Sequence, residues 1–147
     1  MFANELLSEA RKRLITIGTE ALLTDAAKAL SGQHGELVVV CGADGKAVGV
    51  ITKADVVRRI THCQGAACRV TAVAAMTQEM VFCRPDDDVS DVWSKMKQHG
   101  LRHIPIVDDQ SRPLGIINAR DVLQALLINV ANEAELLRDY VLSVGYH

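Results

Sequence analysis

Apolar and polar residues follow the same pattern twice along the chain, with residue 49 lying over residue 115 and the offset kept without a gap. In both copies apolar residues occur at the spacing i, i+3, i+4, i+7, which is typical of a helix with one buried face. These residues are Leu23, Ala26, Ala27 and Leu30 in the first copy and Val89, Val92, Trp93 and Met96 in the second. The chain is therefore an internal repeat, and its fold has to be assigned as one.

Each copy predicts a strand, a helix, two strands and a second helix. The first copy predicts a strand at 14–17, a helix at 24–32, strands at 36–41 and 47–51, and a helix at 53–62. Gly42 and Gly45 supply the positive φ that a tight turn between its two later strands requires. The second copy predicts a strand from Val81, a helix at 89–99, strands at 104–107 and 114–117, and a helix from 119 to about 130.

Repeat units of fewer than about 60 residues bury too little surface to be stable alone. We therefore predict a mixed α/β (α+β) fold in which two βαββα repeats pack sheet to sheet about a pseudo-two-fold axis. The predicted parts are an N-terminal helical arm at 1–13, a first repeat at 14–62, a connector at 63–76, a second repeat at 77–130 and a C-terminal helical arm at 131–147. We expect the connector to hold a loop at 64–67 and a short helix within 70–76.

Each arm has one apolar face, and that face needs something to cover it. The residues are Phe2, Leu6, Leu7 and Ala10 in the first arm and Leu136, Leu137, Tyr140, Val141 and Val144 in the last. A self-complementary two-fold contact is the commonest way to cover such surfaces. We therefore expect a homodimer.

The composition is that of an ordinary globular protein: of 147 residues, 49% are hydrophobic and 23% charged. The net charge of −2 contains no long run of one sign, so we expect no binding to nucleic acid or to a membrane surface. The start of the chain has neither the order of a secretory signal nor the acid-poor composition of a transit peptide, which favours a cytoplasmic location.

Four cysteines are present, and in a reducing compartment we expect them to be free thiols. Cys63 and Cys68 lie near His62, but their spacing does not match that of structural zinc sites. We therefore expect no metal.

The end of each predicted third strand carries a motif. The residues Gly49-Val50-Ile51-Thr52-Lys53-Ala54-Asp55 run from a strand into a helix as Gly-h-h-Thr-x-x-Asp, where h is apolar. This motif resembles the signature of the cystathionine-β-synthase (CBS) domain. The second copy keeps Gly115 and Asp121 but has Asn118 in place of threonine. The segments Met76-Thr77 and His103 to Asp108 are also similar to the family's patterns, so the resemblance extends from about residue 14 to residue 130.

The resemblance implies a tandem CBS pair, or Bateman module, that binds an adenosine-containing nucleotide between its repeats. It implies that the aspartate of each motif accepts hydrogen bonds from a ribose diol, and that the threonine or its substitute contacts the ribose or a phosphate. A carboxylate has acceptors for both hydroxyl groups, and each such bond contributes about 1.5 to 3 kcal/mol. The candidate ligands are AMP, ADP and ATP, with NAD and S-adenosylmethionine as further possibilities, and no cofactor is required.

The candidate nucleotide-binding residues come from both motifs and from the strands beside them. They are Gly49, Thr52, Lys53, Asp55, Thr77, Arg102, His103, Ile104, Pro105, Gly115, Asn118, Arg120 and Asp121. The two glycines let the backbone approach a ligand closely, and the first turn of each following helix offers free N–H groups to a phosphate.

The two sites differ in charge, because the pair Arg102-His103 aligns with Glu36-Leu37. The resemblance places Arg102 and His103 near phosphates in the second site, with Arg120 and Lys53 beside them; the alternative is that they are solvated turn residues. We expect Glu36 to disfavour a polyphosphate in the first site, which would take adenosine, AMP, a nicotinamide dinucleotide or nothing.

Each motif also fits a helix N-cap, because threonine or asparagine is followed three residues later by an acid. One residue can serve both as a cap and as a ligand contact. Among functions, we favour a regulatory module without catalysis that forms a disc-shaped homodimer and signals to a partner protein by conformational change. The alternatives are a structural adaptor with empty pockets and a small hydrolase using Asp55, Asp121 and a histidine, for which the sequence offers no nucleophile motif.

Overall fold

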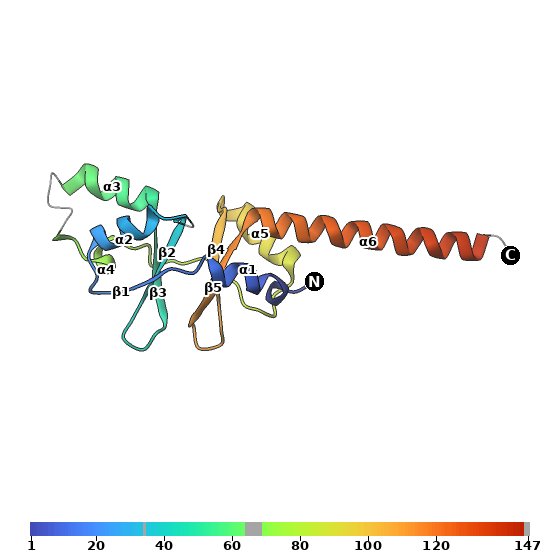
Figure 1. Ribbon diagram of the computed structural model, residues 1–147, viewed down its shortest axis with the longest axis horizontal. Helices are drawn as coiled ribbons and strands as arrows, with labels where there is room; N and C mark the ends of the chain where they lie inside the picture. The colour runs from blue at the N-terminus through green and yellow to red at the C-terminus, as the bar shows by residue number, and fades with distance from the viewer. Residues whose placement is uncertain (34, 64–68, 146–147) are drawn as a thin grey trace.

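The computed structural model describes residues 1–33, 35–63 and 69–145 and contains the two predicted repeats side by side (Figure 1). The first repeat consists of β1 (Thr16–Gly18), α2 (Leu23–Leu30), β2 (Leu37–Cys41), β3 (Ala47–Thr52) and α3 (Lys53–Cys63). The second consists of α5 (Val89–His99), β4 (His103–Val107), β5 (Pro113–Asn118) and α6 (Ala119–Gly145). The mixed α/β fold is confirmed, and the first repeat has the predicted order of elements.

The last two strands of each repeat pair in the same register. In the first, β1 pairs in parallel with β2, and β2 pairs antiparallel with β3 so that Leu37 lies opposite Thr52. In the second, β4 pairs antiparallel with β5, and His103 lies opposite Asn118. The strand expected from Val81 is reduced to a single parallel bridge between Cys83 and Ile106.

The packing of sheet against sheet is also present. A small cluster of fully or nearly fully buried side chains joins Leu37 and Val39 of β2 to Ile116 of β5. Each repeat has its own larger core on the other side of its sheet, beneath its helices. One face of each sheet therefore packs against the other sheet, and the opposite face packs against the helices of its own repeat.

The N-terminal arm belongs to the core of the second repeat. It forms η1 (Ala3–Leu6) and α1 (Leu7–Lys12), and Ala3 and Ala10 are fully buried in that core. Gly115 of β5 allows this approach, because a Cβ atom there would lie 2.6 Å from the backbone carbonyl carbon of Ala10. The connector meets the first repeat in the same way: a Cβ on Gly49 would lie 2.6 Å from the sulfur of Met76.

The connector and the C-terminal arm differ in how they match the expectations. The short helix of the connector is α4 (Ala72–Ala75), whereas the loop expected at 64–67 lies outside the described residues. The helix expected to end near residue 130 continues as α6 to Gly145, so it and the arm from residue 131 are one helix. No proline or glycine lies between Ala119 and Ser143 to stop it.

Two further observations complete the fold. None of the helices in the described part of the chain has the length and apolar character needed to cross a bilayer. Cys41 and Cys83 are free thiols, and burial raises the pKa of the Cys83 thiol to about 12, with a smaller contribution from Asp87. The Cys83 thiol is therefore a packing group rather than a reactive one.

Candidate ligand-binding clefts

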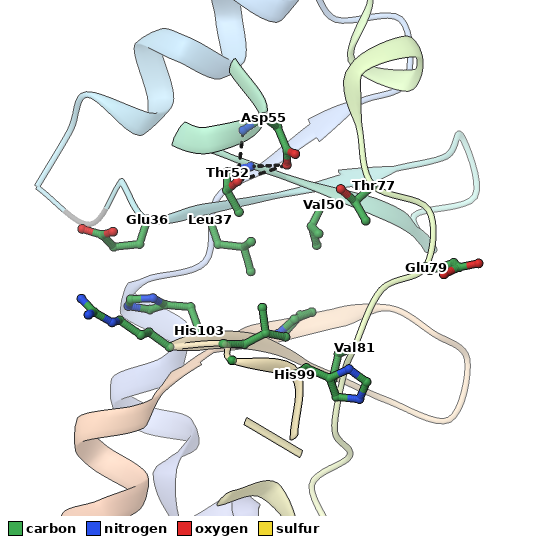
Figure 2. Close-up of a pocket in the computed structure, with 14 residues that line it drawn as sticks. Glu36, Leu37, Val50, Thr52, Asp55, Thr77, Glu79, Val81, His99 and His103 are labelled. Atoms are coloured by element: carbon green, nitrogen blue, oxygen red, sulfur yellow. Dashed lines mark hydrogen bonds between the residues drawn. The ribbon is translucent and has the colours of Figure 1, made fainter. Parts of the chain in front are cut away.

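A cleft of about 380 Å³, which we call the first cleft, lies between the two repeats. One wall comes from the first repeat and includes Val50, Thr52 and Asp55, and the other comes from the second repeat (Figure 2). The segment that follows the connector contributes Thr77, Glu79 and Val81 to its lining. Its remaining lining residues are Glu36, Leu37, His99, Gly100, Leu101, Arg102, His103 and Pro105.

Thr52 and Asp55 form a reciprocal cap at the start of α3. The Asp55 carboxylate accepts hydrogen bonds from the Thr52 backbone N–H at 2.9 Å and from its hydroxyl at 3.1 Å. The Asp55 backbone N–H donates to the Thr52 hydroxyl oxygen at 3.3 Å. This is the capping arrangement that the motif allowed, and it holds both side chains on the wall of the cleft.

Asp55 is a buried carboxylate with an exposed counter-ion. Its residue is 8% exposed, and its second oxygen, Oδ1, lies 3.2 Å from an Arg58 guanidinium whose side chain is 67% exposed. A pair with one solvated partner contributes little. A hydroxyl donor entering the cleft can therefore take the place of Arg58 at that oxygen without leaving a buried cation unpaired.

The facing wall carries the basic residues of the second repeat. Arg102 and His103 lie at the start of β4 and line the first cleft together with Pro105. The alignment of the two repeats predicts this pair at the site of the second repeat. Because the sheets pack face to face, the start of β4 also lies across the first cleft from Thr52 and Asp55. The same two residues also line a shallower hollow with Asn118 and Arg120.

His103 is held mainly in its neutral form. Burial is the largest effect and lowers the pKa of the imidazole. Glu36 raises that pKa, while Arg13 and Arg102 lower it further. A neutral ring can both donate and accept a hydrogen bond, so His103 adds polar contacts to the wall of the cleft with little positive charge.

A smaller hollow of about 230 Å³, which we call the second cleft, is the pseudo-symmetric counterpart of the first. Each of its six lining residues stands at the repeat position of a residue that lines the first cleft. They are Arg13, Gln33, Glu36, His103, Ile116 and Asn118, which correspond in order to Glu79, His99, Arg102, Leu37, Val50 and Thr52. Asp121, the counterpart of Asp55, is missing from this set.

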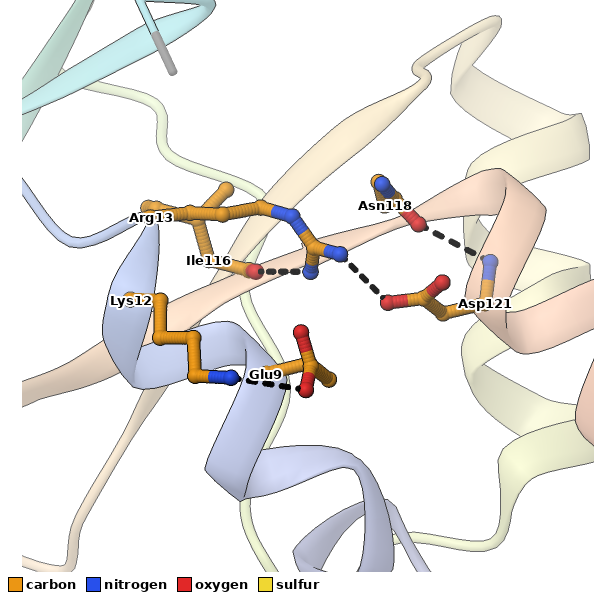
Figure 3. Close-up of polar contacts among 6 residues, drawn as sticks. All are labelled: Glu9, Lys12, Arg13, Ile116, Asn118 and Asp121. Carbon is orange, nitrogen blue, oxygen red and sulfur yellow. Dashed lines mark hydrogen bonds and ion pairs between the residues drawn. The ribbon is translucent and has the colours of Figure 1, made fainter. Parts of the chain in front are cut away.

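Arg13 explains why Asp121 does not line the second cleft. Its guanidinium donates to the Asp121 carboxylate at 2.6 Å and to the carbonyl oxygen of Ile116 at 3.3 Å (Figure 3). The two side chains are only 16% and 20% exposed, so this is a largely buried ion pair. Asn118 caps α6 by accepting from the Asp121 backbone N–H at 2.8 Å. The second motif is therefore intact as a cap, but its carboxylate is already bound.

The remaining predicted site residues lie outside the first cleft. Gly49 and Gly115 pack against the connector and α1, and Ile104 is fully buried in the second core. Lys53 is exposed and lies 3.7 Å from the Glu36 carboxylate. Arg120 lines only the shallower hollow beside Asn118.

Sequence reasoning did not predict Arg13 and Glu79 as site residues. The signal was present, because extending the repeat alignment upstream of both copies places Arg13 over Glu79. The charge is reversed at this position, as it is between Arg102 and Glu36, and Arg13 also binds the aspartate of the second motif. His99, the last residue of α5, also lines the first cleft and was not among the predicted site residues.

Comparisons with known proteins agree with the repeat. The sequence profile of the CBS domain matches residues 5–62 and 70–128. An uncharacterized protein of Methanopyrus kandleri is 30% identical over 132 residues, which are 89% of this chain and 67% of that protein. A CBS-domain protein of Agrobacterium tumefaciens has a crystal structure that matches with 28% identity and a TM-score of 0.72, covering 85% of this chain and 98% of that one.

A third match concerns a CBS domain pair solved in complex with 5′-methylthioadenosine and S-adenosyl-L-methionine. It has a TM-score of 0.70 at 23% identity and covers 86% of this chain and 95% of that one. At this identity the match shows the shared fold. Two profile matches in register, a relative that covers most of the chain and the common fold lead to one conclusion: this chain belongs to the CBS-domain family, as a tandem pair of CBS domains.

Proposed function

We propose that this protein is a regulatory module that binds an adenosine-containing nucleotide in the first cleft and has no catalysis of its own. The observation that carries the proposal is the position of Asp55, a buried carboxylate on the wall of a cleft of about 380 Å³ between the repeats. This volume is within the range of small-molecule sites, about 300 to 1,000 Å³. The CBS domain pair solved with two adenosyl compounds supports the same ligand class.

The polar groups of the cleft suggest how such a ligand would be held. Asp55 would accept hydrogen bonds from the ribose diol, as the family resemblance implies, and Thr52 and Thr77 would contact the sugar or a phosphate. The apolar surfaces of Leu37, Val50 and Val81 lie in the same cleft and suit the flat face of a base. Surfaces that suit the base and groups that suit the sugar are thus close together in the first cleft.

Charge favours a ligand with few phosphates. Glu36, Asp55 and Glu79 line the first cleft, whereas Arg102 is the one arginine or lysine in the described lining. Like charges at short range disfavour binding. We therefore expect AMP, or S-adenosylmethionine with its positively charged sulfonium group, to bind more tightly than ATP.

The proposal assigns one ribose-binding cleft to each chain. In the second cleft the Asp121 carboxylate is occupied by the Arg13 guanidinium, so a ribose would have to displace a largely buried ion pair. Breaking such a pair leaves an uncompensated charge and is costly. Nucleotide binding at Asp121, which the repeat predicts, therefore requires Arg13 to move away.

The proposed module acts in the cytoplasm as a homodimer that signals to a partner protein. Val57 on α3 and its repeat counterpart Leu123 on α6 are both exposed, as is Ile60 one turn after Val57. These apolar helix faces fit the disc-shaped pairing that the family resemblance implies. A ligand that bridges the two repeats of each chain would change their relative position, and the dimer would transmit that change.

The experiment is a thermal-shift panel with AMP, ADP, ATP, NAD, S-adenosylmethionine and GTP on the purified chain and on Asp55→Asn. The asparagine keeps an acceptor for the cap of α3 but removes the charge that would bind the diol. A ligand at 100 times its Kd adds about 2.7 kcal/mol of stability. We expect an adenosine-selective rise in Tm in the wild type and its loss in Asp55→Asn.

Asp109→Asn is the matched control, because the Asp109 side chain is 97% exposed and Asp109 is not among the residues that line the first cleft. It should keep the full ligand response. A panel with no response in the wild type would overturn the proposal and favour the adaptor with empty pockets. Consumption of AMP or ATP by the pure protein would overturn the assignment as a non-catalytic module.

A further inference from the structure

The second half of α6 has no cover in the described part of the chain. The helix is 27 residues long, about 40 Å at 1.5 Å per residue. Its buried residues, Val122 and Ala125, belong to its first two turns. From Leu127 onward every residue whose side chain is described is exposed, and the helix projects beyond both repeats (Figure 1).

This projecting half of α6 carries an apolar stripe at heptad spacing. Leu127, Val130, Ala134 and Leu137 follow one another at intervals of three, four and three residues. Leu127, Val130 and Leu137 are 61%, 61% and 64% exposed. In the sequence the same intervals continue at Val141 and Val144. An average spacing of 3.5 residues is that of a coiled-coil seam.

The charged residues beside the stripe indicate which helix would pack on it and whether the two helices would run parallel or antiparallel. With Leu127 at heptad position a, Glu133 falls at g and Arg138 at e of the following heptad. In a parallel coiled coil, g of one helix faces e of the other five residues later, so Glu133 would face Arg138 of a second copy. In an antiparallel pair, g faces g and e faces e, so Glu133 and Arg138 would not face each other. The charges therefore complement a second copy of this chain in parallel orientation.

We propose that the projecting half of α6 forms a parallel two-stranded coiled coil with the same segment of a second copy. The inference rests on the homodimer of the proposed function for its partner, but not on nucleotide binding. It adds a second contact between the chains, away from α3, and holds the two C-terminal ends of α6 together. Two modules joined in this way would lie at the same end of the coiled coil.

The direct test is oxidative cross-linking of the full chain with Leu137→Cys. Position 137 is a d position, so in a parallel coiled coil the two new thiols face each other across the seam. Asp139→Cys is the matched control, because position 139 is an f position that faces away from the seam. We expect a disulfide-linked dimer with Leu137→Cys and only the wild-type background with Asp139→Cys. Equal cross-linking of the two variants, or none with Leu137→Cys, would overturn the proposal.

A second test separates this contact from the rest of the dimer. Sedimentation equilibrium of Val130→Glu/Leu137→Glu should show at least a tenfold weaker dimer than wild type. Ile128→Glu should not, although Ile128 is 56% exposed, because it lies off the stripe at position b. If Val57→Glu on α3 gives monomers while the double variant stays fully dimeric, the coiled coil is overturned and the dimer of the proposed function survives. Cross-linking without any nucleotide response would overturn the proposed function alone.

Discussion

The first and second clefts are built from equivalent positions of the two repeats, but the charge is reversed at two of these positions. At one of them Arg102 of the first cleft is replaced by Glu36 in the second. Glu79 lines the first cleft, and Arg13 stands at the same repeat position in the second. Arg13 binds the aspartate of the second motif at 2.6 Å, whereas the aspartate of the first motif faces an exposed arginine. Two copies of one motif can thus have different availability for a ligand because of a residue outside the motif.

The largest expected difference between the repeats concerns the two motif glycines. Gly115→Ala would place its Cβ against the backbone of Ala10, which cannot move without displacing α1. Gly49→Ala would mainly meet the side chain of Met76, which can change its rotamer, although the Thr77 carbonyl oxygen is also close. We expect a loss of about 3 kcal/mol for Gly115→Ala and about 1 kcal/mol for Gly49→Ala. Urea unfolding measures both, and equal losses would contradict the comparison.

The next effect is the loss of the Arg13 ion pair. Arg13→Gln leaves Asp121 without its cation, and we expect the free energy of unfolding to fall by about 2 kcal/mol. Lys12→Gln is the matched control, because Lys12 forms an ion pair with Glu9 on the surface (Figure 3). The Lys12 and Glu9 side chains are 66% and 58% exposed, so this pair should contribute less than about 0.5 kcal/mol. Equal stability changes in the two variants would show that the Arg13 contact does not hold the second cleft.

A smaller effect concerns phosphate selectivity in the first cleft. Glu79→Gln removes one negative charge from its lining, so the Kd of ATP should fall by about threefold relative to that of AMP. The change should shrink at high salt because these charges are partly solvated. Calorimetric titration with both nucleotides measures the ratio. An unchanged ratio would show that Glu79 does not face the phosphates.

The smallest effect is a dependence of stability on pH that comes from His103. Its pKa is lowered in the folded state, so the unfolded chain binds more protons once the pH falls below the ordinary histidine pKa. Stability should therefore decrease as the pH falls from about 7.5 to about 5.5. His103→Leu, which copies Leu37 of the first repeat, should show a smaller decrease over the same range. An equal decrease in the variant would assign the pH effect to other groups.

Much of the fold could be predicted because the periodicity of the sequence repeats in register. The helix predicted at 89–99 agrees with α5, and the Gly-h-h motif marks the strand ends at Thr52 and Asn118. Both are local patterns in the sequence, because the spacing of apolar residues reflects which face of each helix or strand is buried. The end of α6 was predicted wrongly at about residue 130, because the boundary between repeat and arm is a change of environment and not of helix propensity.

The candidate site could be predicted only in part, because its remaining contacts are tertiary. Asp55 and Thr52 followed from a motif, whereas the pairing of Arg13 with Asp121 joins residues far apart in the chain. The position of Arg102 across from Asp55 depends on how the two sheets face each other, and no property of one repeat determines it. The assignment of each residue to nucleotide binding stays a prediction.

The most direct measurement is calorimetric titration of AMP into the wild type, Asp55→Asn and Asp121→Asn, with the number of sites per chain as the readout. We predict one site per chain in the wild type, its loss or at least a tenfold weaker Kd in Asp55→Asn, and its retention in Asp121→Asn. Two sites per wild-type chain, or binding that is lost in Asp121→Asn and kept in Asp55→Asn, would contradict the account.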